Sequence, residues 1–283
     1  MRAFLWLLVF LLGQNVNGQD WLVKARQLES HNLKDPKAIG FAPEEVVAPG
    51  NTPVFLHLAE HGRESRIRVG ALLALASRLR GTIKGTYKFE SLPFKPEIPG
   101  DEARRVILKC LQDPDPWVRK KAWGVVGTGF LQKRPPDPVM VDFVSQGLVR
   151  LAKPDSEWES NYCAKTTYYL SQPAPKLEAA MLACAQTTRF PNTFGHFTNS
   201  LAYRSKNFPR RPEFVKVFLT RLQDPNGEIR WHCLQGLERA LTRAEISGNL
   251  KKIEALKKDP VAKVRDQADL TYRRLQSRMQ GAK

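Results

Sequence analysis

Three ten-residue stretches of the chain repeat one pattern, and this repetition constrains the fold more than any other feature. They begin at Asp113, Asp224 and Asp259. Each reads Asp-Pro, a gap of three residues, a β-branched apolar residue followed by Arg, a gap of two, and a small residue. Internal repeats at intervals of about 35 to 45 residues are typical of stacked helical hairpins. The pattern therefore predicts a helical repeat protein.

The residue types in the pattern have physical roles. Pro is tolerated in the first turn of a helix and Asp can accept hydrogen bonds from the free N–H groups there, so we expect a helix to begin at each Asp-Pro. The apolar residue and the small residue four positions later share one helix face, which predicts a buried stripe. Arg at the edge of this stripe can reach an Asp of the adjacent turn, which predicts a structural ladder built from Asp113, Arg119, Asp224, Arg230, Asp259 and Arg265.

Two weaker copies extend the pattern along the chain. One surrounds Arg68 and has Gly62 in place of the Asp. The other starts at Lys153 and has Glu159 in place of the Arg and Tyr162 in place of the small residue. The ladder is therefore uncertain in the middle of the chain.

In these motifs the chain resembles the HEAT-repeat family of armadillo-like helical proteins, including the short bacterial HEAT-like repeats. The resemblance implies an all-α fold, an α-solenoid of about six helical hairpins whose second helices line a concave face. It also implies an interaction surface, so we expect a non-catalytic scaffold that binds a protein partner. We further expect a monomer without a cofactor. Bilin lyases and alkylpurine DNA glycosylases have similar repeats, so an enzyme of either type is an alternative.

Helical periodicity places the hairpins along the chain. A capping helix is predicted at 21–33, and hairpins are predicted at 53–79, 101–131, 139–170, 176–204, 213–244 and 250–279. Residues 81–100 contain three prolines and read as an extended Pro/Gly-rich insertion. No strand is predicted.

The N-terminus reads as a secretory signal peptide over residues 1–18. Arg2 precedes an apolar run at 3–12 and a short polar segment, and we expect cleavage after Gly18. The run has about half of the roughly 20 residues that span a bilayer, so no integral span is expected after cleavage, and a retained anchor is the alternative. The repeat domain at 19–283 is then secreted or periplasmic, which argues against both enzyme types because their substrates lie inside cells or organelles.

The formal net charge is +17, or +16 once Arg2 is removed with the signal segment. A surface of this charge attracts polyanions in a salt-dependent manner. The second interpretation is therefore a polyanion-binding module for nucleic acid, anionic polysaccharide or a membrane surface.

Basic residues interleaved with aromatic ones mark a candidate binding face on the predicted second helices. Such a mixture combines contacts to phosphate or carboxylate groups with stacking on rings. The predicted binding residues are Lys120, Lys121, Trp123, Arg204, Lys206, Arg210 and Arg211, with Tyr168, Tyr169, Phe190, Phe194, His196 and Phe197 nearby in the sequence. The alternative is a solvated charged face with aromatic residues in the core.

Motifs for catalysis or metal binding are weak in this sequence. His57 and His61 stand four residues apart on one predicted helix, but no third ligand is identifiable, and we expect no metal. The glycines between Gly124 and Gly129 follow a helix and not a strand, which does not fit a nucleotide-binding loop.

Four cysteines are spread along the predicted helices. Cys110 and Cys233 fall on apolar stripes and read as buried thiols. Cys163 and Cys184 belong to neighbouring hairpins, so either two buried thiols or a disulfide between them fits an exported protein.

The buried stripes yield a first stability prediction. Ala122→Glu and Ala268→Glu should unfold the neighbouring repeats because each buries an unpaired charge. Lys121→Glu, one position from Ala122 and off the stripe, should leave thermal melting nearly unchanged. Equal losses of melting temperature in the two kinds of variant would mean that the buried faces are assigned wrongly.

Overall fold

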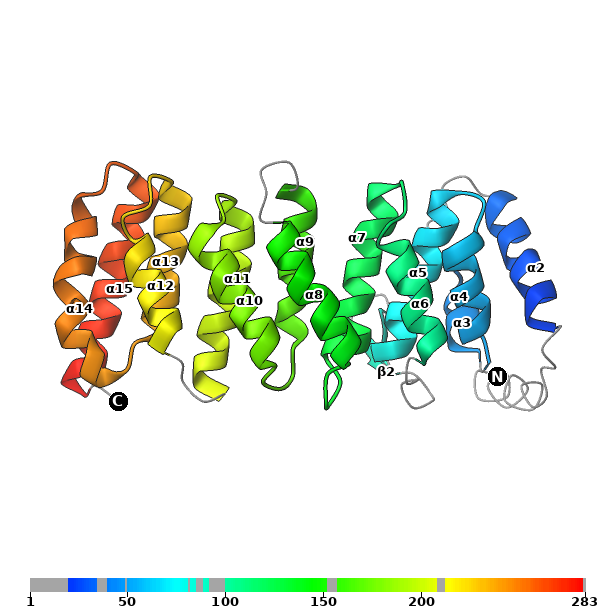
Figure 1. The fold of residues 1–283 in the computed structure, drawn as a ribbon, viewed down its shortest axis with the longest axis horizontal. Coiled ribbons are helices and arrows are strands. Elements are labelled where there is room, and N and C mark those ends of the chain that lie inside the picture. Colours follow the sequence, from blue (N-terminus) through cyan, green and yellow to red (C-terminus); the bar gives the residue numbers. More distant parts are fainter. Residues whose placement is uncertain are drawn as a thin grey trace. The chain divides into compact units, whose positions relative to one another are not determined.

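The computed structural model describes residues 20–34, 40–48, 50–80, 82–84, 89–91, 100–151, 157–207 and 212–281. These residues form fourteen α-helices that pack against their neighbours (Figure 1). The chain divides into two compact units, Met1–Lys133 and Arg134–Lys283. In the described ranges, no helix has the length and apolar character needed to cross a membrane. The predicted signal peptide at 1–18 lies outside the described residues.

Unit 1 contains two helical hairpins, preceded by two further helices. Helix α4 packs against α5, α6 packs against α7, and α5 and α7 lie next to each other. These hairpins match the two predicted at 53–79 and 101–131. The elements are α2 (Asp20–Lys34), α3 (Pro43–Val47), α4 (Thr52–His61), α5 (Ser65–Arg80), α6 (Asp101–Cys110), α7 (Pro116–Val125) and the π-helical η1 (Val126–Leu131).

Two small elements of unit 1 were not predicted. The insertion at 81–100 contains a short antiparallel pair, β1 (Thr82–Lys84) and β2 (Phe89–Ser91), with Thr82 opposite Ser91. Three-residue strands are too short to show a clear period of two in the sequence. Helix α3 lies in a segment read as a loop, and the buried Arg78 guanidinium fixes its end by donating to the carbonyls of Val46 (2.7 Å) and Ala48 (2.9 Å).

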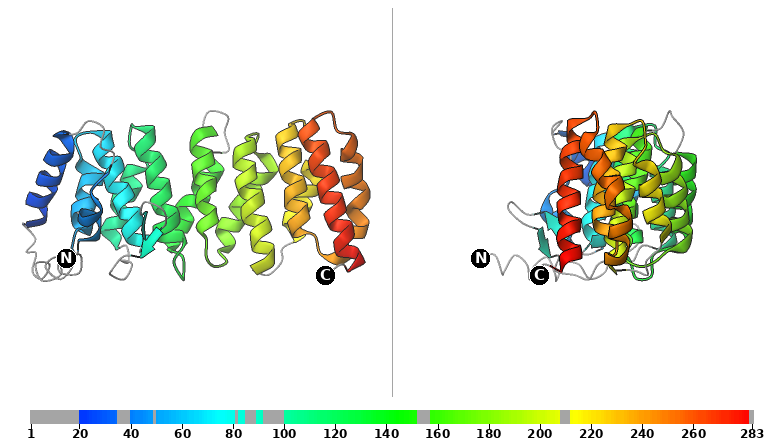
Figure 2. Two further views of the ribbon diagram at one scale, coloured as in Figure 1. Left: turned by 180° about the vertical axis from the view of Figure 1, so that it is seen from behind. Right: turned by 90° about the vertical axis from the view of Figure 1, so that its left-hand side faces the viewer.

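Unit 2 contains four helical hairpins in two layers. The second helices α9, α11, α13 and α15 pack one against the next, and α8, α10 and α12 form the other layer with α14 (Figures 1 and 2). The left view of Figure 2 shows α15 in front of α14. The elements are α8 (Pro138–Arg150), α9 (Glu157–Thr166), the 3-10 turn η3 (Thr167–Tyr169), α10 (Pro175–Thr187), α11 (Pro191–Asn207), α12 (Pro212–Arg221), α13 (Gly227–Ala240), α14 (Arg243–Ala255), η4 (Leu256–Lys258) and α15 (Ala262–Gln280).

The break between the last two hairpins was predicted in the wrong place. We expected one helix to reach residue 244 and the next to begin at 250, but α13 ends at Ala240 and α14 begins at Arg243. Thr242 and Glu245 form a capping box, in which the backbone N–H of Thr242 donates to Glu245 Oε2 at 3.0 Å. This Thr-x-x-Glu signal is present in the sequence and was overlooked.

The three strong copies of the repeat bury the predicted stripes. The β-branched residues at the apolar position are at most 1% exposed, and the small residues four positions later are fully buried: Val118, Ile229 and Val264, then Ala122, Cys233 and Ala268. The prediction is confirmed for these copies.

The copy from Lys153 was assigned in the wrong register. Trp158, at its apolar position, is 38% exposed and packs edge-on against Tyr162 with ring centres 4.8 Å apart. The buried residues of α9 are instead Ser160, Cys163, Ala164 and Thr166.

The Asp of each motif forms a turn rather than capping the helix. Asp113 Oδ1 accepts a hydrogen bond from the backbone N–H of Asp115 at 2.9 Å, and Asp115 in turn caps α7 by accepting from Trp117 N–H at 2.7 Å. Asp224 accepts in the same way from Asn226 at 2.8 Å. The helices therefore begin after the Asp-Pro pair, at Pro116, Gly227 and Ala262, which corrects the predicted helix starts.

Arg68 and Arg230 join consecutive hairpins, which confirms the ladder prediction at these two rungs. Arg68 donates to both carboxylate oxygens of Asp113, at 2.8 and 3.1 Å, and to the carbonyl of Gly62 in its own loop at 2.9 Å. Arg230 does the same with Asp259, at 2.8 and 2.7 Å, and with the carbonyl of Asp224 at 2.7 Å. Each rung thus ties one interhelix loop to the next.

Arg119 and Arg265 make the contact to their own loops, through the carbonyls of Asp113 and Asp259, each at 2.8 Å. The hairpin before Asp224 has no motif, and Arg221 supplies the guanidinium instead. Its Nε donates to Asp224 at 2.8 Å, and its Nη2 donates to the Thr188 carbonyl at 2.8 Å, after the end of α10. The ladder is therefore maintained by a different residue at this point.

The rung between Arg230 and Asp259 yields a second stability prediction. Hydrogen bonds from Arg230 lower the pKa of Asp259, and both side chains are buried. Asp259→Asn leaves the guanidinium without its anion and should lower the free energy of unfolding at neutral pH by about 3 kcal/mol, measured by urea denaturation.

The pH dependence of this effect has a definite sign. Because the folded state has the lower pKa, the stabilisation is complete above about pH 4, the ordinary range of Asp, and is lost as the pH falls through the folded-state pKa. Asp266→Asn, at an exposed position of the following helix α15, is the matched control and should change little. Equal stabilities of Asp259→Asn and Asp266→Asn at neutral pH would show that the rung contributes nothing.

Candidate functional site

The predicted binding residues on α7 fall into two environments. Lys120 and Lys121 are half-buried, and Lys120 Nζ lies 4.4 Å from the centre of the exposed Trp117 ring. Trp123 is only 1% exposed, so its place on a binding surface was predicted wrongly. Helix α7 packs against both α5 and α6, which buries a wider arc of it than one stripe.

The remaining predicted binding residues belong to unit 2. Arg204 and Lys206 are on α11, and their side chains lie outside the described part of the chain. Arg210 and Arg211 also lie outside it.

The histidine pair on α4 lies in a packed environment, and the neighbouring Glu60 forms ion pairs. His57 lies edge-on to Trp21 of α2, with ring centres 5.4 Å apart. Glu60 accepts from both terminal nitrogens of Arg105 on α6, at 2.6 and 2.7 Å, and these bonds lower the pKa of Glu60 to about 2. In the described residues, no group of three or more His, Cys, Asp or Glu side chains could hold a metal ion.

The four cysteines are buried free thiols, including Cys163 and Cys184, for which a disulfide was the alternative. Burial raises the pKa of Cys110 and of Cys184 to about 12. These thiols are therefore protonated at neutral pH and are poor nucleophiles.

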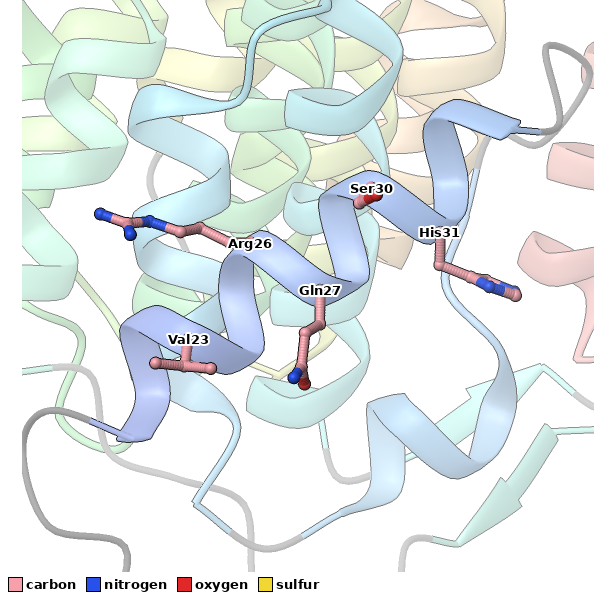
Figure 3. A pocket seen from close by; sticks show the side chains of 5 residues that line it. All are labelled: Val23, Arg26, Gln27, Ser30 and His31. Carbon is pink, nitrogen blue, oxygen red and sulfur yellow. The ribbon is translucent and has the colours of Figure 1, made fainter.

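A shallow hollow on α2 does not form a cleft. Its lining residues all belong to this one helix, and their side chains spread outward from it (Figure 3): Val23, Arg26, Gln27, Ser30 and His31. A ligand there would contact one helix face only.

The strongest polar arrangement lies on the second helices of unit 2. Arg239 of α13 donates to Asn199 Oδ1 at 2.7 Å, and Asn199 Nδ2 of α11 donates to the Tyr168 hydroxyl at 3.2 Å. The same hydroxyl is 2.8 Å from His196 Nδ1. Three elements thus contribute to one chain of hydrogen bonds on a partly exposed surface, where Tyr168 is 40% exposed.

Hydroxyl side chains position Tyr168 in this chain. Thr166 and Thr167 donate to carbonyls three residues earlier, at 2.6 and 2.7 Å, which tightens the end of α9 into η3. Thr167 Oγ1 also lies 2.9 Å from Ser200 Oγ on α11, and Thr193 donates to Ser160 at 3.3 Å. These small pairs hold α9 and α11 in a fixed register.

The direction of the hydrogen bonds follows from the donors. Arg side chains only donate, so the Asn199 atom that faces Arg239 is the oxygen, and the amide nitrogen faces Tyr168. The phenol oxygen accepts from that nitrogen, and it shares a further hydrogen bond with His196 Nδ1 whose direction depends on the imidazole tautomer. When Nδ1 accepts from the phenol, neutral His196 carries its proton on Nε2, and that N–H is a donor on a partly exposed ring.

Tyr168 and His196 are both neutral near pH 7. Burial, with the nearby charges of Lys165 and His232, lowers the pKa of His196 to about 4. Burial also raises the pKa of Tyr168 and lowers that of His232. The positive charge at the site therefore resides on Lys165 and Arg239.

Aromatic rings continue from this chain across α13 to α15. The His232 ring lies against the backbone of Gly195, where an added Cβ would come within 2.4 Å of it, so only glycine leaves room for the ring. The centre of the Trp231 ring is 4.6 Å from that of His232, and Lys263 Nζ of α15 lies 3.7 Å from the centre of the Trp231 ring. We call Tyr168, His196, His232 and Trp231 the ring row.

Only some residues of this site are predicted from the sequence. Tyr168 and His196 were placed near the candidate face, whereas Phe194 and Phe197 are fully buried. Asn199, Trp231, His232 and Arg239 were missed. A repeat alignment was the available signal, because Trp231 and His232 fill the gap of two residues after the motif Arg.

Comparison with known proteins assigns no family to the chain. No protein-family model matches the chain, and no curated protein is significantly similar to it in sequence.

The geometry of His196 yields a testable titration. Its imidazole signals in NMR should shift with a midpoint near pH 4, well below the ordinary value of about 6.5. Because the folded state resists protonation, the contribution of His196 to stability should fall between pH 6.5 and pH 4 and then level off, seen as the difference between wild type and His196→Gln.

Lys165→Gln should raise the midpoint by removing a nearby positive charge, and His196→Gln identifies the signals. A midpoint at the ordinary value in the folded protein would contradict the buried, neutral imidazole.

Proposed function

We propose that this chain is an exported, non-catalytic HEAT-like scaffold that binds a protein partner. The observation that carries the proposal is the repeated Arg–Asp rung, seen as Arg68 with Asp113 and again as Arg230 with Asp259. A rung of this kind holds consecutive hairpins at one spacing, and stacked hairpins present extended faces suited to a macromolecule. We infer an α-solenoid and membership of the HEAT-repeat family from the same motif.

Export is inferred from the sequence. The charged start, the apolar run and the short polar segment before Gln19 support cleavage of a signal peptide and a secreted or periplasmic location.

Binding is favoured over catalysis by the character of the polar groups. The thiols are buried and protonated, and Glu60 is engaged by cations of a neighbouring helix. The partly exposed groups of unit 2 instead form donors and ring faces, which suit recognition.

A polyanion remains the second candidate because of the net charge. Its binding would depend steeply on salt, since each phosphate or sulfate contact releases a counterion. Salt dependence therefore separates the two candidates.

Affinity capture tests the proposal. The purified chain from Gln19 to Lys283 is immobilised at low and at moderate salt, and the retained molecules are identified by mass spectrometry. We expect one protein to be retained at both salt concentrations, because shape and apolar contacts persist when charges are screened. The Ala268→Glu variant, with its stripe disrupted, is the control for folded-state binding. If only polyanions are retained, and if they are released at moderate salt, the scaffold proposal is wrong and the chain is a polyanion-binding module.

A further inference from the structure

We propose that the ring row of unit 2 binds an extended acidic peptide segment of the partner. The segment carries an Asp or Glu side chain and, about three residues away, an apolar or proline side chain. This inference rests on the proposed scaffold function and names the site and the ligand chemistry.

The acidic side chain is assigned to the Tyr168 end of the row. In the tautomer protonated on Nε2, His196 offers a donor on a partly exposed ring, and its orientation is fixed through Tyr168 and Asn199 by the Arg239 guanidinium. Lys165 is exposed and lies close enough to His196 to affect its titration. A neutral donor with Lys165 close to it, and with Arg239 at the other end of the same hydrogen-bond chain, is suited to a single carboxylate.

The apolar side chain is assigned to Trp231. This ring is half-buried, Lys263 Nζ lies against it, and Glu228 accepts from that ammonium at 2.6 Å. The ion pair fixes the ammonium beside the ring, so the site keeps one shape. A rigid aromatic face of this kind binds apolar or proline side chains at low entropic cost.

The distance between the two positions sets the spacing in the peptide. His196 is on α11 and Trp231 is on the adjacent α13. Packed helices lie about 8 to 10 Å apart, and an extended chain covers about 3.3 Å per residue. With this axis spacing taken as the separation of the two side chains, a carboxylate at one position and an apolar group at the other are about three residues apart.

The local charges favour a peptide over a polyanion. Glu228 pairs with Lys263, and Glu238 pairs with Arg274 at 2.7 Å, so acidic groups alternate with cations along α13 and α15. A continuous line of phosphates or sulfates would meet these carboxylates. A peptide with one acidic side chain would not.

Synthetic peptides test the inference. A library of fluorescein-labelled peptides of about nine residues carries Glu at position five and varied apolar residues or Pro at position eight, and a matched library carries Gln at position five. Binding to the purified protein is measured by fluorescence anisotropy. We expect a subset of the Glu peptides to bind and their Gln counterparts to bind at least about tenfold more weakly.

Protein variants locate the binding. Arg239→Gln and His196→Gln should each weaken the selected Glu peptides by about tenfold or more, while circular dichroism confirms that both are folded. Arg273→Gln is the matched control, because Arg273 is exposed and pairs with Asp269 on its own helix at 3.0 Å. It should leave affinity unchanged.

Other results would overturn the inference. They are equal binding of Glu and Gln peptides, no binding by either library, or binding of a single-stranded oligonucleotide that is lost in Arg239→Gln. In affinity capture, equal retention of a protein by the wild type and by Arg239→Gln would show that the partner does not bind at this site. The proposed scaffold function would still be supported. Capture of no protein at either salt concentration would remove the scaffold function itself.

Discussion

The bidentate contact between an Arg of one hairpin and the Asp of the next is the constraint on which each unit depends. Arg230 satisfies the carbonyl of Asp224 in its own loop and both carboxylate oxygens of Asp259 in the following one. Asp259 also accepts from the backbone of Val261, so one carboxylate orders a turn and a helix start together. Desolvated charges are tolerated here because nearly every donor and acceptor is used. The result is a fixed offset between helices, on which apolar packing then builds.

At the hairpin that lacks the motif, a different arginine makes the ladder contact. The candidate site includes residues of this hairpin. Arg221 takes over the contact to Asp224, and hydroxyl pairs such as Thr167 with Ser200 join α9 to α11. Small polar side chains bring these helices together without filling their outer surface. Departures from a repeat pattern are expected at functional sites, because the residues there are selected for something other than packing. The ring row begins in this stretch with Tyr168 and His196 and ends in the adjacent motif copy with Trp231 and His232.

Local patterns allowed most of the fold to be predicted, because the repeat marks loops and buried stripes directly. Val118 and Ala122 are buried as the spacing indicated, and the helices follow the expected order. The errors share one cause, which is that a short pattern does not show what packs around it. Trp123 looked like a surface residue because a single stripe was assumed, yet α7 has neighbours on two sides. Tyr162 was placed by counting from Lys153, although the buried face of α9 is set by Ser160 and Cys163.

The site was less predictable than the fold because its parts are distant in sequence and depend on helix register. Tyr168 meets Asn199 across 31 positions, and Asn199 meets Arg239 across 40. The hydroxyl pairs that set the register of α9 and α11 are each 33 positions apart, close to one repeat. A shift of one residue between these helices would rotate Tyr168 by about 100° relative to His196 and break the chain. Gly195 adds a second condition, since any larger residue there displaces His232 from the row. The arrangement of donors is therefore a property of the packed hairpins, and a function based on it requires the helix register to be intact.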